Sequence, residues 1–117
     1  MSFVVQRRQT DNVTILSCSG RIATSEDANQ LLDAYWQSIK TTQHVIVNLE
    51  RLSILGSLGL GALILLHQWA SSSGRQFKVA GSTGLVHEIL EMTRMTDVLS
   101  IYPHEDQALA ALAASAA

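Results

Sequence analysis

The chain has 117 residues, of which 47% are hydrophobic, and its formal net charge is −2. This size and apolar content are those of one ordinary globular domain, placed here at residues 1–117, which needs no disulfide or metal to fold. The two lysines and six arginines are scattered, apart from the pair Arg7 and Arg8. Because no basic stripe can follow a phosphate backbone, the composition argues against nucleic-acid binding.

A single cysteine, Cys18, lies in an apolar segment. It cannot form an intramolecular disulfide, so we expect a buried thiol in a reducing compartment, and the cytoplasm is favoured. The first residues lack the apolar core and the cleavage site of a signal peptide. The apolar stretch from Leu52 to Gly74 is interrupted by glycines and serines and is shorter than the roughly 20 apolar residues of a membrane span. We therefore predict a buried helix there and no membrane insertion.

The first third of the chain predicts a β-hairpin followed by a helix. Phe3–Arg8 and Val13–Ser19 are extended candidates, and residues 9–12 between them suit a tight turn. Both faces of the second strand carry apolar groups, which is typical of a central strand. Thr24, with Asp27 three residues later, resembles a capping box at a helix start. From Thr24 the apolar residues recur at the spacing of one helical face. They are Ala28, Leu31, Leu32, Tyr35, Trp36 and Ile39.

The rest of the chain continues to alternate strands and helices. The predicted elements are a strand at His44–Leu49, a helix at Leu58–Ser72, a strand at Gln76–Ala80, a helix carrying Leu85, Val86, Ile89, Leu90 and Met92, a strand at Val98–Tyr102 and a helix at Glu105–Ala116. The second helix is apolar nearly all round, so we expect it to be buried. This order predicts an α/β domain in which a mixed sheet of four to five strands is packed with about four helices.

The run from His44 to Trp69, HVIVNLERLSILGSLGLGALILLHQW, resembles the signature of the STAS domain, in which a buried strand leads into Asp-Ser-Ser-Gly-Leu-Gly at a helix start. Ser-Gly-Arg-Ile at 19–22 and the strand and helix that begin at Phe77 also resemble the corresponding parts of that family. The resemblance covers almost the whole chain. It implies a single STAS-like domain and a bacterial anti-sigma-factor antagonist, which regulates transcription by partner switching.

In that family, the second serine of the signature is phosphorylated by a kinase that is also an anti-sigma factor, and phosphorylation breaks the complex. The signature falls on residues 56–61 and places Gly56 at the acidic position, Ser57 at the first serine and Leu58 at the acceptor serine. The acceptor hydroxyl is therefore missing. Ala23 also stands near the position of the family's aspartate after the second strand. The resemblance thus implies partner binding without the usual phosphoserine control.

Ser57 keeps one hydroxyl at the start of the second helix. The favoured interpretation is that this hydroxyl caps the helix. The alternative is a phosphorylation site, because a helix start offers free N–H groups and a positive dipole end to a phosphate. The neighbouring glycines favour close backbone packing, and the alternative for them is a flat recognition surface. An exposed Leu58 would favour that second interpretation.

We predict that the partner surface combines the start of the second helix with the loop before the first. Its residues are Arg21, Ala23, Thr24, Gly56, Ser57, Leu58 and Gly59. The expected partner is an anti-sigma factor or a serine kinase-like protein, and a homodimer is a further possibility. The alternative functions are a cytoplasmic accessory subunit of a lipid or anion transporter, and a nucleotide or small-molecule sensor that uses the glycine-rich turn.

The sequence offers little support for catalysis. Gly59-Leu60-Gly61 lacks the third glycine of a dinucleotide fingerprint, and no glycine is followed by lysine as in a phosphate-binding loop. Ser57 does not have the spacing of a hydrolase nucleophile, and the four histidines are far apart in sequence. We therefore predict a non-enzymatic protein with no catalytic residue, no metal site and no cofactor.

Overall fold

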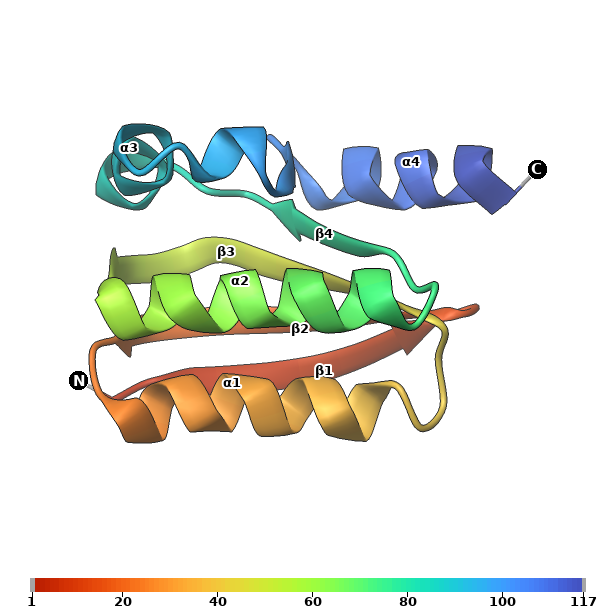
Figure 1. Ribbon diagram of the computed structural model, residues 1–117, viewed down its shortest axis with the longest axis horizontal. Helices are drawn as coiled ribbons and strands as arrows, with labels where there is room; N and C mark the ends of the chain where they lie inside the picture. The colour runs from red at the N-terminus through yellow and green to blue at the C-terminus, as the bar shows by residue number, and fades with distance from the viewer. Residues whose placement is uncertain (1, 117) are drawn as a thin grey trace.

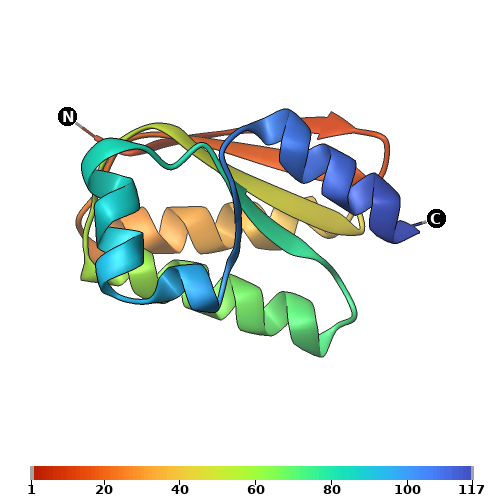
Figure 2. The same cartoon turned by 90° about the horizontal axis from the view of Figure 1, so that it is seen from above.

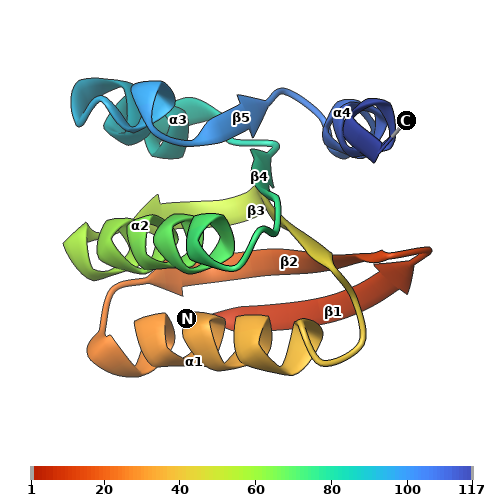
Figure 3. The same ribbon diagram turned by 45° about the vertical axis from the view of Figure 1, so that its right-hand side comes forward.

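The alternation of strands and helices gives one mixed sheet with helices on both faces. The computed structural model describes residues 2–116. Its elements are β1 (Val4–Thr10), β2 (Val13–Ile22), α1 (Ser25–Ser38), β3 (His44–Leu55), α2 (Ser57–Ser72), β4 (Phe77–Ala80), α3 (Gly84–Met92), a short 3-10 helix (Met95–Asp97), β5 (Ser100–Tyr102) and α4 (Glu105–Ala116). The strands follow one another in the order β1-β2-β3-β4-β5 (Figure 3). Only the β1–β2 pair is antiparallel among these strands.

The β1–β2 hairpin is tighter than the sequence predicts. Thr10 pairs with Val13, so the turn itself contains only Asp11 and Asn12. Asp11 takes a φ of 51°, a left-handed conformation that aspartate tolerates better than most residues. The prediction of a turn over residues 9–12 is therefore wrong at its first two residues, because both of them pair in the ladder.

Strand β3 lies in the middle of the sheet, as predicted, but it continues past Leu49 to Leu55. The predicted strand ends at Leu49, directly before the charged residues Glu50 and Arg51. The backbone past Leu49 still pairs with β2, through a register that shifts between Ser17 and Ser19 and again after Gly20. The long parallel pairing brings the carboxyl ends of β2 and β3 to the same edge of the sheet.

The helices are divided between the two faces of the sheet. Helices α1, α2 and α3 contribute to the larger buried cluster, which includes Leu31, Leu63 and Leu90. Helix α4 covers part of the opposite face (Figure 2), where Ala108 and Leu112 join a smaller cluster. In Figure 1, α1 and α2 lie side by side and run in the same direction. That direction follows because each helix begins at the carboxyl end of one of two neighbouring parallel strands.

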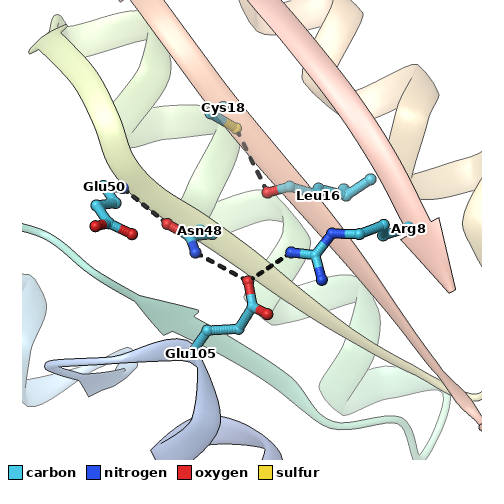
Figure 4. A network of polar contacts seen from close by, with 6 residues as sticks. All are labelled: Arg8, Leu16, Cys18, Asn48, Glu50 and Glu105. Carbon is cyan, nitrogen blue, oxygen red and sulfur yellow. Dashed lines mark hydrogen bonds and ion pairs between the residues drawn. The ribbon is translucent and has the colours of Figure 1, made fainter. Parts of the chain in front are cut away.

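A polar network holds the first turn of α4 against the sheet (Figure 4). Arg8 donates a hydrogen bond to Glu105 Oε1 at 2.8 Å, and Asn48 Nδ2 donates to the same oxygen at 3.0 Å. Asn48 Oδ1 in turn accepts from the Glu50 N–H at 2.8 Å. These residues come from β1, β3 and α4, so a single carboxylate joins three elements.

Two expectations about burial are wrong. The first concerns Trp36, which lies on the apolar face predicted for α1 but is 45% exposed. The second is α2, which is not buried all round, because Leu58 and Leu65 are 48% and 39% exposed. Helix α3 likewise leaves Leu85 and Met92 in solvent. Within residues 2–116, no helix has both the length and the hydropathy needed to cross a membrane.

Candidate functional site

Two strand-to-helix connections meet at the carboxyl edge of the central strands. Ile22, the last residue of β2, pairs with Leu55, the last residue of β3. The N–H of Gly56 then donates to the carbonyl of Ile22 at 2.9 Å, which ties the second connection to the first. The structure therefore brings together the two segments that were predicted to form a partner surface, although they are more than thirty positions apart in the sequence.

The connection from β2 to α1 is held by a capping box. The N–H of Asp27 donates to Thr24 Oγ1 at 3.1 Å, and Asp27 Oδ2 accepts from the N–H groups of Ala23 and Thr24 at 3.0 Å each. The hydrogen bonds from the backbone N–H groups of Ala23 and Thr24 lower the pKa of the Asp27 carboxyl. The predicted box is confirmed, so the hydroxyl of Thr24 organises the loop while the side chains of Arg21 and Ala23 are exposed.

The connection from β3 to α2 depends on close packing at two glycines. A Cβ at Gly59 would lie 2.6 Å from Leu55 Cδ1 and 2.9 Å from Ile22 Cγ2, and one at Gly56 would lie 3.2 Å from the Ile22 carbonyl oxygen. Gly61 differs, because a Cβ there would meet nothing within 4 Å. The close-packing interpretation therefore holds for Gly56 and Gly59, and Gly61 borders open space.

The side chains of Ser57 and Leu58 both face solvent at the start of α2. The prediction that Ser57 caps this helix is wrong, because the N-cap is Gly56 and no side chain bonds to the first turn. Ser57 is already the first residue of the helix, one position too late for its hydroxyl to cap it. Leu58 is 48% exposed, the condition under which the sequence favoured a recognition surface.

An apolar groove adjoins these residues, and the sequence did not predict it. It lies between α1 and α2 and has a volume of about 470 Å³. Its lining residues are Ser25, Ala28, Asn29, Leu32, Ser57, Leu58, Gly61, Ala62, Ile64 and Leu65. Leu32 and Leu65 fit the helical periodicity of a core face, so no sequence signal distinguished them from fully buried residues.

Groups that could carry chemistry are few in the described part of the chain. Burial raises the pKa of the Cys18 thiol to about 12, so the thiolate that acts as nucleophile is suppressed. Ser82 Oγ lies 2.8 Å from His87 Nδ1, and the Ser82 residue is only 8% exposed. Residues 2–116 contain no group of three histidine, cysteine or acidic side chains that could hold a metal ion.

Fold and site together define a small α/β domain with a five-stranded mixed sheet and paired loops at its carboxyl edge. The family model of the STAS domain matches residues 4–108. An anti-sigma F factor antagonist from Paenibacillus polymyxa is 25% identical over 114 residues, which cover 96% of this chain and 97% of that protein. The chain belongs to the STAS domain family.

Solved structures confirm the predicted fold. An anti-sigma factor antagonist from Mycobacterium paratuberculosis superposes with a TM-score of 0.84 at 23% identity, over 94% of this chain and 93% of that one. The anti-sigma factor antagonist SpoIIAA in its unphosphorylated form gives a TM-score of 0.80 at 14% identity, over 95% of this chain and 97% of that one. The five-stranded sheet and the order of its elements are therefore those of the family.

Proposed function

We propose that this protein is a non-enzymatic regulatory subunit of the cytoplasm that binds an anti-sigma factor or a serine kinase-like protein. The observation that carries the proposal is the exposed Leu58 at the point where the two connections meet. An exposed apolar side chain beside an apolar groove is typical of a site that binds a protein partner. The anti-sigma F factor antagonist from Paenibacillus polymyxa, which matches nearly end to end, supports the class of partner.

The proposed surface consists of Arg21, Ala23, Thr24, Gly56, Ser57, Leu58 and Gly59. These residues have different parts in it. Gly56 and Gly59 let α2 approach Ile22 closely, and Thr24 fixes the neighbouring loop. The exposed side chains that remain to contact a partner are those of Arg21, Ala23, Ser57 and Leu58.

Binding is tested with two leucines in matched positions. Leu58 and Leu85 are each the second residue of a helix, and both are exposed, at 48% and 58%. Aspartate suits the first turn of a helix equally well at either position. With the purified anti-sigma factors and serine kinases of the source organism as probes, Leu58→Asp should weaken capture by at least tenfold and Leu85→Asp should not. Equal binding of both variants, or no binding of the unaltered protein, would contradict the proposal.

The proposal includes loss of the usual phosphoserine control. SpoIIAA has been solved in a phosphorylated form as well as an unphosphorylated one, so a phosphorylated state exists among the structural neighbours. Here Leu58 stands at the family's acceptor position, and the hydroxyl of Ser57 is one residue earlier in the helix. After incubation with the captured kinase and ATP, we expect an unchanged intact mass. The gain of one phosphate, abolished by Ser57→Ala, would show that control persists at Ser57.

A further inference from the structure

Large apolar side chains on α1 and α2 continue past the end of the groove. Leu32 on α1 is followed one turn later by Trp36, and Leu65 on α2 is followed one turn later by Trp69. The two indole rings are in contact, with centroids 4.9 Å apart. From Ser25 to Trp36 the apolar strip is roughly 16 Å long at the rise of an α-helix, which is the length of about three helical turns.

This strip contains large apolar side chains that the fold leaves exposed. Trp36, Leu58 and Leu65 are three of the eight large hydrophobic side chains that are exposed among the described residues. Neither α3 nor α4 covers the strip, because α4 packs on the opposite face of the sheet and α3 packs beside β3. Exposed tryptophan and leucine gathered in a groove are typical of protein interfaces.

The rim of the groove carries acidic side chains on the α1 side. On α1, Glu26 and Asp33 lie on the same helical row as Asn29, which lines the groove. Neither carboxylate forms an ion pair with any residue in 2–116. The groove-lining residues contributed by α2 are all uncharged. Lys40 follows the end of α1, and its Nζ lies 3.3 Å from Gln37 Oε1.

The shape and the charge together select one kind of occupant. Two parallel helices leave a straight apolar trough that a third helix fills with residues at every third and fourth position. An acidic rim on one side favours basic residues along one flank of that helix. A second copy that packed through its own α1 and α2 would offer no lysine or arginine, because neither helix contains one, so it is disfavoured.

We infer that the α1–α2 groove binds an amphipathic helix of the partner, with an apolar stripe toward the groove and lysine or arginine along the flank that faces α1. This inference rests on the function proposed above and specifies which element of the partner is recognised. Leu58 then belongs to both surfaces, since it lines the upper end of the groove and stands beside the β2–α1 loop.

The test uses designed helical peptides as probes, and the chain's own tryptophans report binding. Trp36 and Trp69, the only two tryptophans in the sequence, lie one helical turn beyond the groove-lining Leu32 and Leu65. A peptide with a leucine stripe and a lysine flank should shift their emission to the blue in a saturable way. The same peptide with a glutamate flank should bind at least tenfold more weakly. Equal binding of the two peptides, or no saturable change, would overturn the inference.

Variants of the protein locate the site. Leu65→Glu should weaken binding of the lysine-flanked peptide at least tenfold. Leu85→Glu, which changes an exposed leucine outside the groove, should leave this binding unchanged. Gly61→Gln fills the trough at a position where a Cβ has free space, so it should also weaken binding while the fold is retained. Glu26→Lys combined with Asp33→Lys should reverse the preference between the two peptides. Unchanged binding in Leu65→Glu and Gly61→Gln would contradict the groove.

A last comparison separates this inference from the proposed function. A captured anti-sigma factor or kinase can bind Leu58→Asp more weakly and yet bind Leu65→Glu as tightly as the unaltered protein. In that case the proposed function stands and the helix-in-groove inference fails. If no such partner binds the unaltered protein, the proposed function fails, and the peptide preferences still decide the chemistry of the groove. Weakened partner binding in Leu65→Glu, with Leu85→Glu unaffected, supports both.

Discussion

At the scale of single residues, the start of α2 shows how the same residue type serves opposite purposes. Gly59 is buried and lets the helix approach Leu55 and Ile22, whereas Gly61, two positions later, borders the groove. A methyl group would therefore be crowded at the first position and free at the second. The pair allows steric effects to be separated from helix propensity, since both glycines lie in the same helix.

We expect Gly59→Ala to destabilise the protein and Gly61→Ala to stabilise it. Overpacking a filled core costs about 1–3 kcal/mol, and replacing a helical glycine by alanine returns up to about 1 kcal/mol. Gly59→Ala should thus lose about 1–2 kcal/mol net, because the side chains that it meets are themselves buried. Urea denaturation of both variants measures the two free energies of unfolding. A stabilising Gly59→Ala would show that Leu55 and Ile22 can move aside.

At the scale of elements, the capping box explains why α1 begins where it does. The carboxylate of Asp27 accepts the N–H groups of Ala23 and Thr24, and these two donors lie outside the helix, before its first turn. The helix start and the loop of the proposed partner surface are therefore one hydrogen-bonded unit. Damage to the box should loosen the loop as well as shorten the helix.

The box predicts a dependence of stability on pH. Backbone hydrogen bonds lower the pKa of Asp27 in the folded protein, so the folded state holds its proton less tightly than the unfolded state does. The stabilisation is therefore present above the ordinary carboxyl pKa and is lost as the pH falls through the lowered value. In Asp27→Asn this loss in acid should be smaller. Thermal unfolding between pH 2 and pH 7 measures it, with Asp33→Asn, an exposed carboxyl on the same helix, as the control.

At the scale of the whole molecule, the two faces of the sheet are held by different means. The face under α1, α2 and α3 has an extensive apolar core, and the face under α4 has a small one supplemented by the Glu105 network. Partial burial raises the pKa of Glu105, but the hydrogen bonds from Arg8 and Asn48 outweigh it, so the pKa is lowered overall. The carboxylate therefore contributes to the docking of α4 as an anion.

We expect Glu105→Ala to weaken the docking of α4 at neutral pH. The loss should be about 1–2 kcal/mol, since Arg8 is mostly exposed and its side of the ion pair is screened by water. Asp106→Ala is the matched control, because it removes the neighbouring acid from the same helical turn. The difference between the two variants should shrink as the pH falls through the lowered pKa of Glu105. Amide hydrogen exchange in α4 at pH 7, compared between the variants, localises the effect, and equal protection in both would contradict it.

Local patterns in the sequence determine much of this fold without reference to tertiary contacts. Short-range spacing predicted the β1–β2 hairpin, the Thr24 and Asp27 box and the last helix from Glu105, because the interactions that form them span only a few residues. The resemblance around residues 56–61 located the meeting point of the two connections. The second half of β3 was not predicted, because the apolar run ends at Leu49 and several of the residues that follow in the strand are exposed.

Tertiary structure alone decided which apolar side chains stay uncovered. Periodicity places Trp36 and Leu65 on apolar helix faces, but both side chains are exposed. The pattern shows that a residue is apolar, but it does not show whether another element covers it. Tertiary structure also brings Arg8, Asn48 and Glu105 together, because their contact depends on strand register and on where α4 docks. The sequence by itself thus determined the order and kind of the elements. The packing between them determined the groove and the network, because both are formed by residues far apart in the chain.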